Sequence, residues 1–351
     1  MIYFINLRLG LVLAVSFVVA FNQSALADAE PTAASGYHVL SKIPLEGAGA
    51  GDYLTLDVES RRLYVTHKDM VHVLDADSLK LIGTIKGTTH AHGIVVLDKL
   101  GKGFITSGEP GSVVVFDLKT LKHLAEIASS PDTDGITYDP ASDRVITFNG
   151  DSKNATIIDP NTNKVVKILA LGGSPEAAVP DREGQLFDNL KDKSQVIKIG
   201  TTAFDIEKRW SLAPGQSPSG IALDLKQHRL FVGCRNSLLV VMDSENGKLI
   251  QTLPIGAHVD ATVFDPASGT IFNSCGDGTL SIIHEDSPDK FHVVENVRTE
   301  EGAKTMAFDP QSDQVFLSTA RFEISNSASK DLPKTGRKVV AGSFHVLVMA
   351  K

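Results

Sequence analysis

The feature that most constrains the fold is a strand pattern that recurs seven times along the chain. A polar turn precedes a short run of alternating β-forming residues, as in Leu63–His67, and a second such run follows at Val71–Asp75. The large hydrophobic residue at the second position of the first run recurs every 40 to 44 residues, at Tyr64, Phe104, Ile146, Phe187, Phe231, Phe272 and Phe316. A period in the low forties with several short strands is typical of propeller blades. The sequence therefore predicts an all-β fold, a seven-bladed β-propeller.

Each repeat contains enough chain for four strands. In the fifth repeat the predicted strands are Gly220–Asp224, Arg229–Gly233, Ser237–Met242 and Lys248–Pro254. The turns contain Asp-Pro, Asp-Gly and Asn-Gly pairs, which favour tight reversals of the chain. No stretch has the apolar period of a helix. Because the repeats share one closed ring, residues 36–351 are predicted to form a single domain.

The two ends of the chain are predicted to close the ring. The last repeat ends with the run Phe344–Met349, which corresponds to a third strand with no fourth strand after it. The segment Tyr37–Pro44 near the N-terminus has the pattern of the missing outer strand. We therefore expect this N-terminal strand to complete the last blade, which would remove an open sheet edge.

The first residues are predicted to direct export. Arg8 is the only charged residue of the opening segment, Leu11–Phe21 is an apolar run, and Ala25-Leu26-Ala27 matches a small-x-small cleavage pattern. Residues 1–27 are therefore interpreted as a cleaved signal peptide, and residues 28–35 as a disordered lead-in. No later segment is long and apolar enough to form a transmembrane helix. We expect an exported protein, periplasmic in a Gram-negative bacterium.

The charge balance narrows the range of partners. The chain has 42 Asp and Glu residues against 34 Lys and Arg residues, a net charge of −8. This balance argues against general nucleic-acid binding, which needs a surplus of basic side chains. We expect a monomer that binds a small molecule or a periplasmic protein.

One strand carries a resemblance to a known family. Tyr64-Val65-Thr66-His67 differs by one residue from the tetrapeptide that names the YVTN-repeat propellers, and the blade pattern resembles the wider YncE-like group of exported bacterial proteins. The resemblance covers almost all of the predicted mature chain. It implies the propeller fold but no functional residue, because the tetrapeptide is a strand. One YncE-like protein is associated with DNA binding, so single-stranded DNA binding is an alternative that the resemblance implies.

Aligning the repeats places polar residues where each inner strand begins. Five residues before the turn position occupied by Asp57 in the first repeat, the repeats have Asp52, His92, Asp134, Pro175, Ser219, Asp260 and Lys304. Two residues earlier they have Ala50, His90, Asp132, Gly173, Ser217, His258 and Gly302. The inner strands of a propeller line its central channel, so we expect these residues to ring one mouth of the channel. Glu176, one position after Pro175, is a further candidate.

Two interpretations of this mouth stay open. The first is a ligand site formed by Asp52, His92, Asp134, Glu176 and Lys304. In three repeats both aligned positions hold His or Asp, whose side chains bind divalent metals. A divalent metal is therefore a candidate cofactor, held by His90, His92, Asp132, Asp134, His258 and Asp260. Alternatively, the residues are polar only because the mouth is wet and loop ends favour aspartate.

Three functions are compatible with these residues. The preferred one is a non-enzymatic binding or scaffold protein that uses the mouth for a ligand or a protein partner. The alternative is a metal-assisted hydrolase, lactonase or lyase, with Glu176 or Asp134 as the base. Against it, the asparagine ligands of lactonase propellers are absent from these positions, and the chain has no Gly-x-Ser-x-Gly motif or haem-attachment motif. Single-stranded DNA binding is the third function.

The two cysteines occupy equivalent positions in adjacent repeats. Cys234 and Cys275 each lie ten residues after the turn aspartate of their repeat, Asp224 and Asp265. Export would permit a disulfide, but equivalent positions one blade apart are expected to exceed the reach of a disulfide, about 7 Å between Cα atoms. Two buried thiols are the preferred interpretation, and a soft-metal site that includes His67 is a third option.

The seventh repeat contains an insertion between its second and third strands. Residues 320–343 stand where the other repeats have a short hairpin, and they are rich in Ser, Lys and Gly. We predict that they form a mobile flap above the mouth, whose basic residues balance an acidic site.

Overall fold

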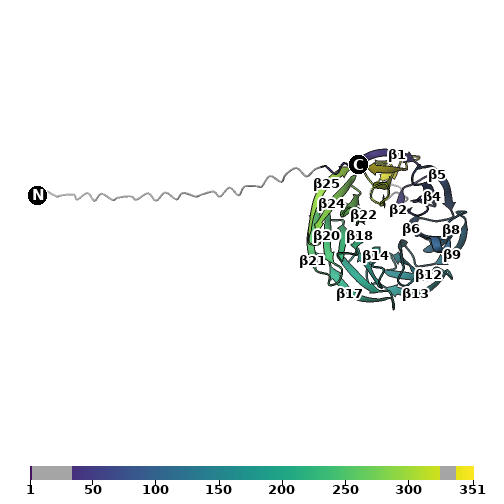
Figure 1. Ribbon diagram of the computed structural model, residues 1–351, viewed down its shortest axis with the longest axis horizontal. Helices are drawn as coiled ribbons and strands as arrows, with labels where there is room; N and C mark the ends of the chain where they lie inside the picture. The colour runs from purple at the N-terminus through teal and green to yellow at the C-terminus, as the bar shows by residue number, and fades with distance from the viewer. Residues whose placement is uncertain (2–33, 325–336) are drawn as a thin grey trace. The chain divides into compact units, whose positions relative to one another are not determined.

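The strands form a closed ring of blades. The computed structural model describes residue 1, residues 34–324 and residues 337–351. Residues 33–351 form one compact unit, and its described part contains seven antiparallel sheets of four strands. The inner strands surround the centre, and the fourth strands lie at the rim (Figure 1). The predicted seven-bladed β-propeller is confirmed, while most of the predicted signal peptide and lead-in lies outside the described residues.

Blades one to three follow the chain from the inner to the outer strand. The first contains β2 (Gly51–Asp57), β3 (Arg62–His67), β4 (Met70–Asp75) and β5 (Leu81–Lys86). The second contains β6 (Ala91–Leu97), the short 3₁₀ helix η1 (Asp98–Leu100), β7 (Lys102–Ser107), β8 (Ser112–Asp117) and β9 (His123–Ala128). The third contains β10 (Thr133–Asp139), β11 (Arg144–Asn149), β12 (Asn154–Asp159) and β13 (Lys164–Ala170).

Blades four to six repeat the same order. The fourth contains β14 (Pro175–Pro180), β15 (Gln185–Leu190), β16 (Gln195–Gly200) and β17 (Asp205–Ser211). The fifth contains β18 (Pro218–Asp224), β19 (Arg229–Cys234), β20 (Leu238–Asp243) and β21 (Leu249–Pro254). The sixth contains β22 (Val259–Asp265), β23 (Thr270–Cys275), β24 (Thr279–Ser287) and β25 (Lys290–Arg298).

The seventh blade is built from both ends of the chain. It contains β26 (Met306–Asp309), β27 (Gln314–Thr319) and β30 (His345–Ala350), and its outer strand is the N-terminal β1 (His38–Pro44). β1 pairs antiparallel with β30, which confirms the predicted closure. Ser35, just before β1, also donates a 2.7 Å hydrogen bond from its hydroxyl to Glu295 of the sixth blade. The N-terminal segment therefore ties the last two blades together.

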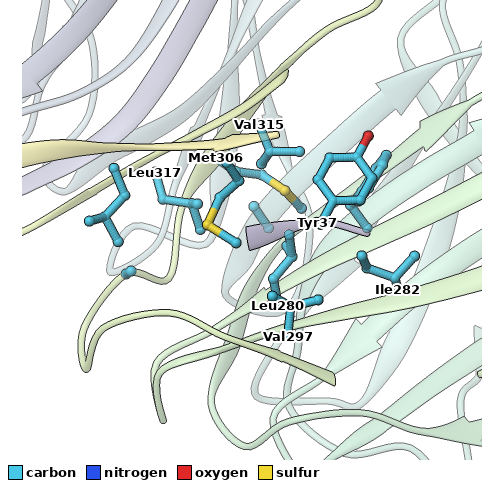
Figure 2. Packing of buried hydrophobic residues seen from close by; sticks show 12 residues of the cluster. Tyr37, Leu280, Ile282, Val297, Met306, Val315 and Leu317 are labelled. Atoms are coloured by element: carbon cyan, nitrogen blue, oxygen red, sulfur yellow. The ribbon is translucent and has the colours of Figure 1, made fainter. Parts of the chain in front are cut away.

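The hydrophobic core is divided into seven clusters within the described chain, one at each contact between neighbouring blades. Each cluster combines buried residues of two adjacent sheets, and the repeated aromatic or aliphatic residue of every second strand belongs to one. Figure 2 shows the cluster between blades six and seven, where Tyr37 packs among Leu280, Val297 and Met306. The Tyr37 hydroxyl donates to Asp313 Oδ1 at 2.6 Å. Every blade thus buries its faces against two neighbours, as a closed ring requires.

Aspartates begin the turn that follows six of the inner strands, for a local reason. The side chain of each accepts the backbone N–H two residues later, which fixes the turn into the second strand; they are Asp57, Asp139, Asp181, Asp224, Asp265 and Asp309. In the fourth blade this residue is Asp181, one position later than the repeat alignment assumed with Pro180. The shift changes which residue of that blade belongs to the mouth.

Two further sequence predictions concern the cysteines and the insertion. Cys234 and Cys275 are free, fully buried thiols in different core clusters, so the preferred interpretation is confirmed. The insertion of blade seven begins and ends as a two-stranded ladder, β28 (Phe322–Ile324) with β29 (Arg337–Val339). The remainder of the predicted flap, residues 325–336, lies outside the described residues.

In the parts of the chain that the structure describes, no helix is of a length and apolarity that would cross a membrane.

Candidate functional site

The candidate site is a ring of side chains at one mouth of the channel, one from each blade. In blades one to six the ring residue is the second residue of the inner strand, and in blade seven it lies just before β26. The ring residues are Asp52, His92, Asp134, Glu176, Ser219, Asp260 and Lys304. Glu176 replaces the predicted Pro175, because the turn of blade four begins at Asp181. Each inner strand contacts the inner strands of both neighbouring blades, so the seven residues follow one another around the mouth.

The ring side chains form a chain of alternating charge. Asp260 Oδ1 lies 3.3 Å from Arg235 Nη1, and its other oxygen forms an ion pair with Lys304. Lys304 Nζ also lies 3.5 Å from Asp52 Oδ1. The second oxygen of Asp52 lies 2.7 Å from His92 Nδ1. The charges of five successive side chains, from blades five, six, seven, one and two, therefore alternate between positive and negative.

The alternation ends at blades three and four, where two carboxyl groups follow each other. Asp134 Oδ1 lies 3.5 Å from His92 Nδ1 but receives no hydrogen bond from the described residues. Glu176 Oε1 accepts bonds from Lys191 Nζ at 2.6 Å and Ser219 Oγ at 3.2 Å. In the described structure no basic side chain bridges Asp134 and Glu176. This position is the break in the charge alternation.

The pKa values reflect this arrangement. The pKa of Asp134 is raised to about 7. Burial is the largest cause, and the nearby charges of Asp52 and Glu176 together raise it more than the charge of His92 lowers it. Burial also raises the pKa of Glu176, against the effect of Lys191. Burial alone would lower the pKa of His92, but Asp52 and Asp134 outweigh that effect and raise it to about 9. At neutral pH His92 is therefore a cation, while Asp134 is partly protonated.

Lys304 and Asp52 stay charged at the same mouth. Burial would lower the pKa of Lys304, but Asp52 and Asp260 raise it above its usual range. Burial would likewise raise the pKa of Asp52, but Lys304 and His92 lower it below its usual value. Burial and the surrounding carboxylates raise the pKa of Tyr53, so its phenol remains a neutral hydrogen-bond donor behind the ring.

Second-strand side chains hold the backbone of the ring. In four blades the fifth residue of the second strand donates to the main-chain carbonyl of the ring residue in the next blade. Thr106 donates to the carbonyl of Asp134 at 2.6 Å, Asn189 to that of Ser219 at 3.1 Å, Ser274 to that of Lys304 at 2.6 Å, and Ser318 to that of Asp52 at 3.2 Å. These bonds cross the blade boundaries, so they set the spacing of the ring residues.

Cavities lie on both sides of the ring. On the outer side, a cavity of about 550 Å³ is lined by Asp52, Lys68, His90, His92 and Lys304 together with small residues. On the channel side, a cavity of about 150 Å³ is lined by Tyr53, Glu176 and inner-strand residues that include Gly135. A Cβ atom on Gly135 would lie 2.4 Å from the carbonyl oxygen of Glu176, so only glycine permits the close approach of β10 and β14.

The outer members of the predicted metal pairs lie apart from the ring. His90, Asp132 and His258 each have a left-handed backbone, with φ of 48°, 60° and 60°, in the turn before the inner strand. His90 and His258 are exposed, and Asp132 accepts the backbone N–H of Asp151 at 3.1 Å. Asp260 faces Lys304 and Arg235.

A different trio at the mouth has the geometry of a metal site. The nitrogen and oxygen atoms of Asp52, His92 and Asp134 that would bind an ion all lie within 4.8 Å of one another. Asp52 and Asp134 are carboxylates and His92 offers an imidazole, a set that suits a divalent transition metal. An ion there would compete with the proton of His92 and with Lys304 for Asp52.

Sequence reasoning predicted Lys304 but missed three other basic residues near the ring. Lys191 and Arg235 each come directly after the second strand of their blade, and Lys68 has the equivalent place in blade one. Aligning that position across the repeats would have found all three. Tyr53, which follows the ring residue of blade one, was also missed.

Comparison with known proteins supports the fold alone. No protein-family model matches the chain, and no curated protein matches it. Among solved structures the chain is similar to one described as Kuenenia stuttgartiensis hydrazine synthase, with a TM-score of 0.68 at 13% sequence identity. The similarity covers 81% of this chain and 95% of that chain. At this identity the shared propeller says nothing about a shared activity.

Proposed function

We propose that the protein is an exported binding propeller whose channel mouth takes a small ligand bearing a positively charged group. The observation that carries the proposal is the break in the charge alternation, where Asp134 and Glu176 follow each other and no basic side chain of the described residues lies between them. A ligand cation at this position would continue the alternation that Arg235, Lys304 and His92 maintain elsewhere in the ring. The N-terminal apolar run and the resemblance to YVTN-repeat proteins support export.

The energetics favour a cation over a neutral ligand. The pKa of Asp134 is raised to about 7, so in the free protein part of its carboxyl population is neutral. A bound ammonium or guanidinium group would favour the ionised form and would make a charge-assisted hydrogen bond. The binding affinity should therefore increase with pH through about 7 and level off once Asp134 is fully ionised. Glu176 lines the channel-side cavity of about 150 Å³, which has room for a small cationic group.

A thermal-shift screen tests this proposal. The panel consists of primary amines, guanidines and quaternary ammonium compounds, each matched with a neutral and an anionic compound of similar size. We expect cations to raise the melting temperature of the wild-type protein and to lose this effect in Asp134→Asn. Asp151→Asn is the matched control, because Asp151 is an exposed carboxylate of the same blade and its substitution removes the same charge. A panel in which only anions or neutral compounds stabilise the protein would contradict the proposal.

A divalent metal at the same mouth is the second candidate, and the close grouping of Asp52, His92 and Asp134 favours it. The two candidates differ in their dependence on His92. An organic cation between Asp134 and Glu176 leaves His92 protonated, whereas a metal needs its neutral imidazole. His92→Gln should therefore abolish metal binding at the mouth but reduce the binding of an amine only modestly. Metal titration of this variant by calorimetry distinguishes the two.

A further inference from the structure

The outer hairpin of blade six is longer than its equivalents in the other blades. β24 and β25 each contain nine residues, whereas the third and fourth strands of blades one to five contain six or seven. The extension ends at the turn between Ser287 and Lys290. Within this part of the hairpin lie two histidines and an aspartate that the proposed function does not use.

The strand register brings these three side chains to one face. His284 and His292 are directly opposite each other across the antiparallel pair. The register shifts between Glu285 and Ser287, which leaves Asp286 as the extra residue of a β-bulge. A bulge redirects the side chain at its position, and here the carboxylate of Asp286 lies between the two imidazoles.

The distances match the coordination sphere of a small divalent metal. Asp286 Oδ1 lies 3.3 Å from His284 Nδ1 and 3.0 Å from His292 Nδ1. Donor atoms about 2.0 to 2.1 Å from a tetrahedral zinc ion are about 3.3 Å from one another. The three donor atoms also all lie within 4.8 Å of one another, so a single ion can reach them with small side-chain rotations.

We propose that His284, Asp286 and His292 form a surface site for a divalent transition metal of the zinc class. Two imidazoles and one carboxylate select such ions over magnesium and calcium, which prefer all-oxygen sites. Three protein ligands leave the fourth position to water or to a donor from another molecule. The site is independent of the channel mouth, because it lies on the two outer strands of blade six.

Blade five holds the hairpin in place. Gln251 of β21 bonds the backbone of Phe291 twice, donating to its carbonyl at 2.8 Å and accepting its N–H at 3.0 Å. Arg229 of β19 donates to the carbonyl of Pro288 at 2.7 Å and to Asp289 Oδ1 at 2.9 Å. Because these bonds fix the residue before His292 and the turn itself, the three ligands are ordered before an ion binds. Such preorganisation increases affinity.

One cation already competes for the carboxylate. Lys290 Nζ lies 3.7 Å from Asp286 Oδ2, but the Lys290 side chain is 76% exposed and can move into solvent. Burial would raise the pKa of Asp286, but its hydrogen bonds to His292 and His284 lower it below its usual value, so the carboxylate is ionised. Replacement of Lys290 by a neutral residue should leave metal binding intact or strengthen it.

Metal titration of untagged, chelator-stripped protein tests the proposal. Calorimetry with Zn²⁺ and visible absorption with Co²⁺ should detect a site that His284→Ala or His292→Ala weakens by about 100-fold or more. Asp286→Asn should weaken it as well, while Lys290→Ala and His92→Gln serve as controls that retain it. All five substitutions affect exposed or partly exposed side chains, and unchanged melting temperatures will show that the blade is intact. Failure of the wild-type protein to bind either ion, or an affinity that survives the double substitution of His284 and His292 in the His92→Gln background, would overturn the assignment.

Discussion

Removal of the Arg61 guanidinium should weaken the contact between the first and last blades. Arg61 Nη1 and Nη2 of blade one donate to the two carboxylate oxygens of Asp309 in blade seven, at 2.9 Å and 2.5 Å. The Asp309 side chain has no exposed surface, whereas the other carboxylate partner of Arg61, Asp77, is 65% exposed. The Arg61→Met variant therefore leaves a buried carboxylate without its cation.

The pKa of Asp309 gives the magnitude of the expected loss of stability in Arg61→Met. Burial would raise it, but Arg61, Ser312 and a backbone N–H lower it from 3.8 to about 2. A difference of about 1.8 corresponds to about 2.5 kcal/mol of stability at about 1.4 kcal/mol for each pH unit. Loss of Arg61 removes most of this stabilisation and leaves the buried Asp309 carboxylate unpaired. We therefore expect the free energy of unfolding to fall by about 2 to 3 kcal/mol at neutral pH.

The pH dependence has a definite sign. Because the folded pKa of Asp309 is depressed, its stabilising contribution is complete above about pH 4 and is lost as the pH falls through about 2. Urea unfolding at neutral pH and at about pH 3 should therefore show a smaller difference between wild type and Arg61→Met at the lower pH. Asp77→Asn is the control, and it should cost less than about 1 kcal/mol because that partner is exposed. A loss below about 0.5 kcal/mol for Arg61→Met, or an equal loss for Asp77→Asn, would refute the reasoning.

Three further predictions concern closure, a buried acid and the spacing of the ring. Deletion of residues 36–45 removes β1 and Tyr37, so the melting temperature should fall sharply; an unchanged value in a calorimetric scan would contradict the closure. Asp188 has no exposed surface and neither carboxylate oxygen has a hydrogen-bond partner among the described residues, so Asp188→Val should stabilise the fold by about 1 to 3 kcal/mol in urea unfolding at neutral pH. Burial raises the pKa of Asp188 far above its usual value, and the gain should therefore shrink as the pH falls from neutral towards about 4, whereas a destabilised variant would show that the acid is needed. Gly135→Ala should lower both stability and the response to ligands, because its Cβ would lie 2.4 Å from the carbonyl of Glu176; normal ligand-induced thermal shifts would contradict this.

The fold could be predicted from the sequence because seven similar segments show the same strand and turn pattern. The residue at the position of Tyr64 is at most 2% exposed in all seven blades, and strand pairing and turn chemistry repeat with it. Ring closure followed from counting strands at the two ends. The one alignment error, Pro175 in place of Glu176, arose because the turn aspartate of blade four is Asp181, one residue after the inner strand ends at Pro180.

The site was only partly predictable. The ring residues of every blade except the fourth came from one aligned column, but their partners Lys191 and Arg235 come from a different position of the repeat. The trio of His284, Asp286 and His292 depends on a strand register and a bulge, which no repeat alignment could supply, because blade six alone of the first six has the longer hairpin. Local periodicity predicts strands, whereas contacts between blades and irregular registers require coordinates.

The proton balance of ligand binding tests the central claim most directly. The measurement is calorimetric titration, at about pH 7 and in two buffers of different ionisation enthalpy, of the amine that gives the largest thermal shift. Because the pKa of Asp134 is about 7, a bound cation should release about half a proton at this pH. In Asp134→Asn the release should disappear and the affinity should fall, while Asp151→Asn should match the wild type. Binding without proton release in the wild type, or equal release in Asp134→Asn, would contradict a cation site between Asp134 and Glu176.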